Sequence, residues 1–435
     1  MPYLDYAASA PLRAEALEAM RPFLEAPAAN PSSQHGPGRA ARHAVETARE
    51  QVAALVGADP AEVVFTSGGT EADNLAVKGT VLARRDDPAA ARGLVASAVE
   101  HHAVLDAAAW AEADAGAEVR LAPVDSQGRV LLDRLGALLG PGRTALVAVM
   151  AANNEVGTLQ PVAATAELAH AADAVLLCDA VQAAGLPGVD LRRDGIDLLA
   201  LAAHKLGGPT GVGALVIRAG TTTPRPLLHG GGQERGLRSG TLPVAAIAGF
   251  GAAAAAALTE RERGHGDPGF QVEGVAHPGP AVALRALRDR LLAGLRGAAP
   301  SLQVNGDPSA AGGLPGLLSA RFPGVRAEDL LLLLDRAGVA CSAGSACASG
   351  AVSASHVLLA MGRTPEEARE TIRFSLGHGS TATDVDAAVA AVRQALDVLA
   401  PELPTGGRPL GRPGSPDAMV GASLLRPPNP PGASR

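Results

Sequence analysis

Apolar residues follow two alternating patterns between about residues 38 and 260. In one pattern they recur every three or four positions, as at Val45, Ala48, Val52, Leu55 and Val56, which is typical of one helix face. In the other they form short runs rich in Val, Leu and Ile, which predict strands at 63–66, 94–97, 145–150, 175–178, 197–202 and 214–217. Helices alternating with such strands predict an α/β fold, with a mostly parallel sheet covered by helices on both faces.

Two segments lack this periodicity. Residues 264–280 mix Gly, Pro and His, and we expect a flexible surface insertion near a domain junction. From about Leu399 to Arg435 the chain is rich in Pro, Gly and Ser, a composition that predicts a disordered tail at 400–435. The full length of 435 residues suits two domains, one large and one small.

Composition narrows the class of protein. Hydrophobic residues make up 47% of the chain but aromatic residues only 2%, so the core must consist mainly of Ala, Val and Leu. The 44 acidic and 37 basic residues are scattered and leave a net charge of −7, which argues against direct nucleic-acid binding. We expect no membrane association and a cytoplasmic protein, because the N-terminus lacks a signal-peptide pattern and long apolar runs are absent. Three cysteines fit a reducing compartment without a disulfide framework.

The polar residues of interest follow the predicted strands, where ligands of such sheets bind. Lys205 precedes a glycine-rich turn and is a candidate Schiff-base lysine, although a lone lysine is most often a surface residue. Asp179 ends an apolar run and could pair with a pyridine nitrogen; taken alone, it would more often cap a turn. Gln182, three residues later, could donate to a ring oxygen or be an ordinary surface residue.

Two further motifs follow strands. Thr-Ser-Gly-Gly-Thr-Glu opens a predicted helix, and the backbone N–H groups near Gly69 and Thr70 could form a phosphate site, with an ordinary helix cap as the alternative. Glu-His-His places His101 where an imidazole could lie on a cofactor and move protons. We do not expect a metal at His101 and His102, because neighbouring residues of a strand point to opposite faces and a third ligand with suitable spacing is lacking.

The cysteines differ in their surroundings. Cys347 lies among small residues in Ser-Ala-Gly-Ser-Ala-Cys-Ala-Ser-Gly, which suits an exposed nucleophile on a mobile loop. Cys178 and Cys341 adjoin apolar runs, so we expect both to pack rather than react.

Taken together and in order, these motifs resemble the cysteine desulfurases that supply sulfur for iron–sulfur clusters and tRNA thiolation, within the fold-type-I enzymes dependent on pyridoxal 5′-phosphate (PLP). The resemblance runs from residue 3 to about residue 398. It rests on the motifs at 3–8, 30–33, 66–71, 100–101, 153–155, 179–182, 204–205, 234–241, 345–347 and 372–377.

The resemblance implies a role for each matching residue. Lys205 would bind PLP as a Schiff base and take the substrate's Cα proton, Asp179 would pair with the ring nitrogen, and His101 would stack on the ring and act as acid and base. The other cofactor contacts implied are Gln182 and Asn154 to the ring oxygen, Gly69, Thr70 and His204 to the phosphate, and Thr241 to the phosphate of the other subunit of a homodimer. Asn154 and Arg373 would bind the substrate L-cysteine, with a structural ion pair as the alternative for Arg373. Cys347 would carry the persulfide for sulfur-acceptor proteins, and whether it also ligates an iron–sulfur cluster transiently stays open.

The resemblance also implies a seven-stranded, mostly parallel sheet in a large PLP-binding domain at 15–258 and a small α+β domain formed by 1–14 and 259–399, with a mobile catalytic-cysteine loop at 341–352. One position departs from the family: Ala202 stands where a serine commonly contacts the phosphate. The alternatives to desulfuration are selenocysteine cleavage, transamination, or a non-catalytic scaffold for sulfur acceptors. Neither of the other PLP reactions obviously needs the loop of Cys347, and a scaffold has no need of an electron sink.

Overall fold

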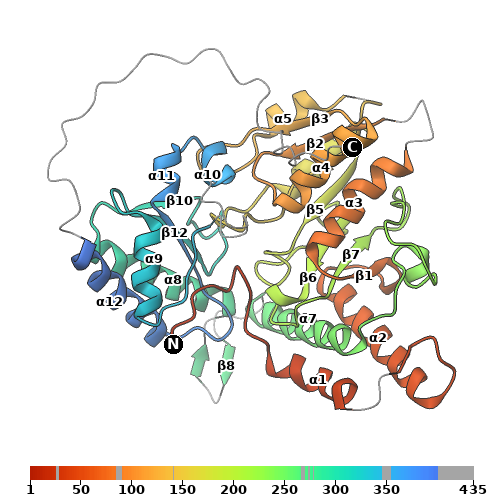
Figure 1. The fold of residues 1–435 in the computed structure, drawn as a ribbon, viewed down its shortest axis with the longest axis horizontal. Helices are drawn as coiled ribbons and strands as arrows, with labels where there is room; N and C mark the ends of the chain where they lie inside the picture. The colour runs from red at the N-terminus through yellow and green to blue at the C-terminus, as the bar shows by residue number, and fades with distance from the viewer. Residues whose placement is uncertain are drawn as a thin grey trace, which may run out of the picture.

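The computed structural model describes residues 1–25, 29–84, 91–140, 142–265, 270–272, 275–277, 279–344 and 354–399. The predicted tail at 400–435, Cys347 and most of the predicted 341–352 loop lie outside these residues. The described chain forms two lobes (Figure 1), the larger one holding the red, orange, yellow and green elements and the smaller one the teal and blue elements.

A seven-stranded sheet forms the centre of the larger lobe, in the order β1-β7-β6-β5-β4-β2-β3. Its strands are β1 (Val63–Thr66), β2 (Gly93–Ser97), β3 (Val119–Ala122), β4 (Thr144–Ala148), β5 (Val175–Asp179), β6 (Leu198–Ala202) and β7 (Gly213–Ile217). Only β7 is antiparallel to its neighbours, so the predicted mostly parallel sheet is confirmed. The sequence prediction missed β3, whose Val-Arg-Leu-Ala segment lies at the sheet edge and buries only Ala122 fully.

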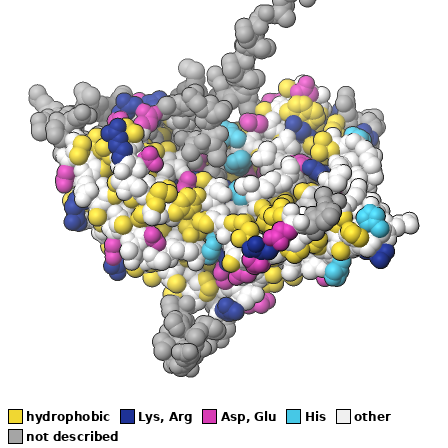
Figure 2. Space-filling model, turned by 60° about the horizontal axis from the view of Figure 1, so that its bottom comes forward, with side chains coloured by type: hydrophobic (Ala, Val, Ile, Leu, Met, Phe, Trp, Pro, Cys, Tyr) yellow, Lys and Arg dark blue, Asp and Glu magenta, His cyan; other side chains and the backbone are white. Residues whose placement is uncertain are grey.

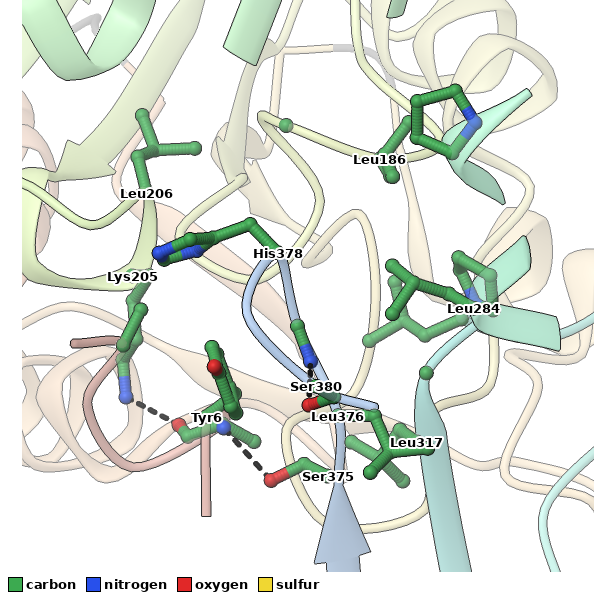
Figure 3. Close-up of a pocket in the computed structure, with 18 of the residues that line it drawn as sticks. Tyr6, Leu186, Lys205, Leu206, Leu284, Leu317, Ser375, Leu376, His378 and Ser380 are labelled. Atoms are coloured by element: carbon green, nitrogen blue, oxygen red, sulfur yellow. Dashed lines mark hydrogen bonds between the residues drawn. The ribbon is translucent and has the colours of Figure 1, made fainter. Parts of the chain in front are cut away.

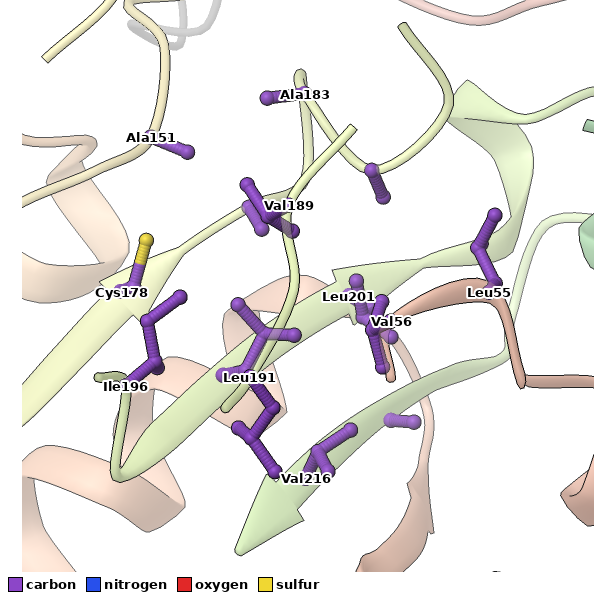
Figure 4. Close-up of a cluster of buried hydrophobic side chains, with 14 of the residues drawn as sticks. Leu55, Val56, Ala151, Cys178, Ala183, Val189, Leu191, Ile196, Leu201 and Val216 are labelled. Carbon is purple, nitrogen blue, oxygen red and sulfur yellow. The ribbon is translucent and has the colours of Figure 1, made fainter. Parts of the chain in front are cut away.

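Side chains alternate across this sheet and build two apolar layers. Leu176 and Cys178 of β5 face the larger core, whereas Val175 and Leu177 face the core on the other side of the sheet. Figure 4 shows Cys178 among the side chains of the larger core, near Val189 and Ile196. Both faces of β5 are buried, which explains why its sequence is a continuous apolar run.

Helices cover both faces of the sheet. Residues of α3 (Gly69–Ala83) and α4 (His102–Ala115) pack on one face. The other face is covered by residues of α2 (Gly36–Leu55), α5 (Leu132–Leu138), α6 (Val162–Ala171) and α7 (Val244–His265), with α1 (Ala14–Glu25) packed beside α7. Three short 3₁₀ helices, η1 (Pro60–Glu62), η2 (Ala203–Lys205) and η3 (Glu234–Gly236), lie in the connections.

The smaller lobe has its own core around a three-stranded antiparallel sheet of β10 (Gln303–Asn305), β11 (Leu317–Arg321) and β12 (Thr371–Ser375). Residues of α8 (Pro280–Ala298), α9 (Ala327–Arg336) and α12 (Ala382–Leu399) complete that core. The short helices α10 (His356–Ala360) and α11 (Pro365–Arg369) precede β12. Within the segment predicted as a flexible insertion, β8 (Phe270–Val272) and β9 (Val275–His277) pair as a two-stranded antiparallel sheet.

The N-terminal segment joins the two lobes. Tyr3 and Asp5 form parallel bridges to Ala340 and Ser375 of the smaller lobe. The chain then crosses to the larger lobe, where the amide of Ala10 donates to the carbonyl of His204 at 2.9 Å. In Figure 1 this stretch is the red trace that runs between the lobes before α1.

Helix α7 has a composition that needs explanation, because among the described residues it is the one helix long and apolar enough to cross a membrane. Half of that apolar window is buried within the protein, where Ile247, Phe250 and Ala254 belong to the larger core. Its apolarity therefore has a sufficient cause in packing against α1 and α2. On the face shown in Figure 2, Lys and Arg side chains are interspersed with Asp and Glu side chains.

The close approach of α7 and α2 predicts an effect of Gly251→Ala. A Cβ atom at Gly251 would lie 2.5 Å from the Cα atom of Ala48, which is backbone and cannot rotate away. We expect the overpacking, about 1–3 kcal/mol, to exceed the roughly 0.5–1 kcal/mol gained by removing a helical glycine. The control is Gly297→Ala near the end of α8, where a Cβ would meet nothing within 4 Å. Urea unfolding should show Gly251→Ala less stable and Gly297→Ala equal to or more stable than wild type; equal stabilities for both variants would contradict the packing argument.

Candidate active site

The predicted site residues lie at the carboxyl edge of the large sheet. Asp179 is the last residue of β5, and Ala202, the last residue of β6, leads directly into His204 and Lys205 of η2. Gly69 opens α3 soon after β1 ends, His101 precedes α4 after β2, and Asn154 follows β4. Because parallel strands end at the same edge, segments far apart in the sequence converge there.

His101, Asp179 and Lys205 are close enough to influence one another electrostatically. Burial lowers the pKa of His101 and outweighs the opposing effect of Asp179, while the charge of Lys205 lowers it further. Burial raises the pKa of Asp179, against the effects of His101, the Val181 amide and Lys205. A cation beside Asp179, such as a protonated pyridine nitrogen, would favour its ionised form.

The ring of His101 has a defined proton position. Its Nδ1 accepts a hydrogen bond from the backbone amide of Ala103 at 3.1 Å and so caps α4. A neutral imidazole that accepts at Nδ1 carries its proton at Nε2. His101 is therefore a neutral donor at Nε2, rather than a cation, near neutral pH.

The amine of Lys205 lies against the N-terminal segment. Its Nζ donates to the carbonyl oxygens of Ala7 and, at 2.8 Å, of Ala8. The side-chain amide of Gln182 donates to the same carbonyl of Ala7 at 2.9 Å. Figure 3 shows Lys205 directed at this segment beside Tyr6, on the wall of a cavity of about 380 Å³ between the lobes. Asp179 and His101 are not part of the lining of that cavity.

Residues 67–70, which we call the phosphate cup, form a tight turn at the start of α3. The carboxylate of Glu71 accepts from the backbone amide of Ser67 at 2.7 Å and so closes the turn. Gly69 must lack a side chain, because a Cβ there would lie 2.7 Å from Cγ2 of Val181 and 3.6 Å from Cβ of Ala202. Thr70 is exposed, and the first amides of α3 are free of helical partners and favour an anion.

His204, two residues after Ala202, is also kept neutral. Burial lowers its pKa to about 4, and the charge of Lys205 contributes in the same direction. A neutral imidazole can still donate one N–H to an anion. Together with the cup and the helix terminus, this ring offers donors suited to a phosphate group.

Arg373, which the resemblance predicts to bind the substrate, lies on β12. Its guanidinium donates to the carbonyl of Asn154 at 2.8 Å and to the carboxylate of Asp5 at 3.0 Å. A third bond reaches the hydroxyl of Ser342 at 3.3 Å, while Nε is buried without a partner. The guanidinium of Arg373 is thus held in an ion pair with Asp5, the alternative role expected for it, and is 4% exposed.

For two predicted site residues, the described structure gives no position at this edge of the sheet. Thr241 is exposed on the loop that precedes α7, and its role toward a second subunit stays a prediction. Cys347 lies outside the described residues. Cys178 is fully buried, and burial raises the pKa of Cys341 to about 12, so both thiols are held in the unreactive protonated form as expected of packed cysteines.

Two acids beneath the site were assigned no role from the sequence, although one of them, Glu100, belongs to the Glu-His-His motif. Asp73 on α3 and Glu100 before α4 are 1% exposed, and each has one carboxylate oxygen without a hydrogen-bond partner. Burial raises the pKa of both well above the usual range, and the nearby charge of Asp179 adds to the rise. The sequence could have indicated Asp73, because an acid among apolar residues of one helix is seldom buried without a partner. Its apolar neighbours are Ala72, Leu75, Ala76 and Val77.

The residues present fit PLP. A glycine cup that a side chain would fill suits the phosphate, the buried Asp179 suits the ring nitrogen, and Lys205 supplies the amine. Among the described residues, three or more His, Cys, Asp or Glu side chains do not come together in a way that could hold a metal ion. The fold and this donor set define a fold-type-I, PLP-dependent enzyme.

Comparison with known proteins agrees with this class. The model of the aminotransferase class-V family matches residues 2–262 and 282–388, so the chain belongs to that family. It is 43% identical over 392 residues to the "IscS-like cysteine desulfurase" of Mycobacterium tuberculosis, covering 89% of this chain and 94% of that protein. It is 40% identical over 397 residues to "Cysteine desulfurase IscS" of Methanosarcina thermophila, covering 91% and 92%.

Solved structures are similar over most of their length. A "NIFS-like protein" superposes with a TM-score of 0.80 at 34% identity and covers 91% of this chain and 99% of that one. The structure of "SspA in complex with cysteine" has a TM-score of 0.71 at 31% identity, covering 86% of this chain and 99% of that one.

The position of Ala202 beside the cup predicts an effect of Ala202→Ser. A hydroxyl there would add a donor next to Gly69, and one hydrogen bond to a charged acceptor should lower the Kd for PLP roughly tenfold. Ala203→Ser adds the same group one residue along, within the larger core, and should not tighten PLP binding. Titration of the apo-protein with PLP checks both; equal Kd values for wild type and Ala202→Ser would show that another donor already fills this role.

The neutral state of His204 predicts a pH dependence of stability. An unfolded imidazole titrates at about pH 6.5, whereas folded His204 stays neutral to about pH 4. Between these values the unfolded chain binds more protons, so this residue makes the free energy of unfolding fall as pH falls from about 6.5 to 4. In His204→Asn the fall should be shallower, while His43→Asn, which removes an exposed imidazole of α2, should match wild type. Parallel curves of urea stability against pH for wild type and His204→Asn would contradict the assignment.

Proposed function

We propose that this chain is a PLP-dependent cysteine desulfurase, which converts L-cysteine to L-alanine and holds the removed sulfur as a persulfide on Cys347. The main observation behind the proposal is that residues 5–8 contact both Arg373 and Lys205. Asp5 binds Arg373, the predicted carboxylate-binding residue, and the carbonyls of Ala7 and Ala8 bind the amine of Lys205. We expect an amino acid bound at Arg373 to have its Cα toward Lys205, and relatives named cysteine desulfurases match nearly the whole chain.

Each residue has a distinct task in this reaction. The guanidinium of Arg373 orients the substrate through its carboxylate, a task suited to its planar fork of donors. The amine of Lys205 removes the Cα proton, and PLP supplies the electron sink that makes this removal feasible. We expect the Nε2–H of His101 to exchange a proton with the substrate thiol, since Nδ1 is occupied by the amide of Ala103.

Sulfur transfer then involves the protein's own thiol. The Cys347 thiolate attacks the substrate sulfur, so that a sulfur–sulfur bond forms while the sulfur–carbon bond of the substrate breaks. The carbon skeleton takes up protons and leaves as alanine. One L-cysteine and one enzyme thiol thus give one L-alanine and one enzyme persulfide, without an added oxidant or reductant.

The acceptors follow from the same resemblance. We propose that Cys347 passes its sulfur to proteins of iron–sulfur cluster assembly, tRNA thiolation or both, in the cytoplasm, and that the enzyme works as a homodimer. The exposure of Thr241 supports the homodimer, because a residue that contacts the cofactor of another subunit must lie at the surface of its own. Sedimentation of the purified protein tests the subunit number.

Product analysis of wild type and three variants tests the proposed reaction. Wild type with PLP, L-cysteine and a thiol reductant should yield sulfide and alanine in a one-to-one ratio. Lys205→Ala should lose the absorbance of covalently bound cofactor, and Cys347→Ala should lose sulfide release by about 1,000-fold or more, because each removes a group that forms a covalent bond. Cys341→Ser, which removes the unreactive thiol, is the matched control and should keep its activity. Full activity of Cys347→Ala, or formation of pyruvate or an amino-transfer product, would instead favour another PLP reaction.

A further inference from the structure

An ion pair joins the phosphate cup to a loop that sequence reasoning treated separately. The loop at 229–241 carries η3 and ends at Thr241. Arg238 of this loop donates to both carboxylate oxygens of Glu71, from Nε at 2.9 Å and from a terminal nitrogen at 3.3 Å. Because the same carboxylate closes the cup by accepting from Ser67, Glu71 belongs to both structures.

The pair is sheltered and ionised. The side chains of Arg238 and Glu71 are 17% and 16% exposed, so solvent screens them less than a surface pair. Burial raises the pKa of Glu71, but the hydrogen bonds from Arg238 and Ser67 outweigh it and leave the pKa below its usual value. Two charge-assisted bonds in fork geometry fix the direction of the arginine as well as its distance.

The side chain of Arg238 also lies beside Gly240, the residue before Thr241. Gly240 has a φ of +130°, and a Cβ there would lie 3.3 Å from a terminal nitrogen of Arg238. The amide of Gly240 donates to the side chain of Gln233 at 2.9 Å. Hydrogen bonds therefore run from the Ser67 amide through Glu71 to Arg238, which lies three residues before Thr241.

A second ion pair holds the other part of the loop. Glu234 is buried and binds Arg49 of α2 through two bonds of 2.8 Å, and it accepts from the amide of Phe65 in β1 at 2.8 Å. Glu234 and Arg235 both have left-handed φ values, +46° and +57°, a conformation that non-glycine residues adopt only under constraint. The loop is therefore fixed at two places, one of which is the cup itself.

We propose that Glu71 and Arg238 are positioning residues that make the phosphate cup and the loop at 229–241 one unit, so that binding a phosphate-bearing cofactor and placing Thr241 depend on each other. The inference rests on the proposed function for the identity of the cofactor. The inference concerns cofactor binding rather than turnover, so it can be wrong even if the protein is a cysteine desulfurase.

The direction in which Glu71→Ala changes phosphate affinity distinguishes a positioning role from a purely electrostatic one. A carboxylate near an anion site repels the anion, so if Glu71 acted by charge alone, Glu71→Ala would tighten phosphate binding. Positioning predicts the opposite, because the Ser67 amide and Arg238 lose their common anchor. We expect the Kd of the apo-protein for PLP, and for inorganic phosphate, to rise roughly tenfold in Glu71→Ala.

A double-mutant cycle completes the test. Arg238→Ala should weaken PLP binding to a similar extent, and the double variant should be little worse than either single variant, because the two act as a pair. Arg238→Lys, which keeps the charge but not the fork, should recover only part of the affinity. The control is Arg290→Ala, which removes an exposed two-bond pair with Asp386 in the smaller lobe and should leave PLP affinity unchanged.

The thermal midpoint of each apo-protein is measured alongside. Tighter phosphate binding in Glu71→Ala, fully additive losses in the double variant, or a lowered Tm with unchanged Kd values would overturn the proposal. Absence of sulfide from wild type would instead reject the proposed function and leave the Kd comparison valid.

Discussion

The carbonyl groups of Ala7 and Ala8 hold the centre of this molecule together. They accept from Lys205 and Gln182 of the larger lobe, while the amide of Ala7 donates to Ser375 of the smaller lobe at 2.9 Å. Two residues earlier, Asp5 pairs with Arg373. A single extended segment thus sets how the amine on one lobe faces the guanidinium on the other. Direct contacts between the lobes, such as the bond from Arg373 to the carbonyl of Asn154 and the ion pair of Arg129 with Asp307, act alongside it.

Burial determines the charge states of this site. It keeps His101 and His204 neutral and opposes ionisation of Asp73, Glu100 and Asp179. Three acids so close together cannot all ionise without a cation near them. A protonated pyridine nitrogen of PLP held at Asp179 would be such a cation, and the neutral imidazoles would remain available as donors.

Sequence patterns predicted the parts of the structure that depend on neighbours in the chain. Six strands of the large sheet were predicted within a few residues, because each is a short apolar run flanked by turns. Strand β3 was missed, since an edge strand with an arginine in its middle has no such pattern. Lys205, Asp179 and His101 could be placed at one edge because parallel strands end together. The partners of Arg373 and the acids beneath Asp179 could not be predicted, because these interactions join residues far apart in sequence. Asp5 pairs with Arg373, and the charge of Asp179 acts on Asp73.

The smaller lobe takes residues from both ends of the described chain, since Leu4 lies in the same core as Phe374 and Val392. During synthesis, residues 14–258 can leave the ribosome and form most of the larger core while the N-terminal segment still lacks its partners in the smaller lobe. Leu4 then remains exposed to solvent until β12 and α12 have been made. The order of translation therefore delays assembly of the pocket until nearly the whole described chain exists, and an incomplete chain would have Lys205 without the Asp5–Arg373 pair opposite it.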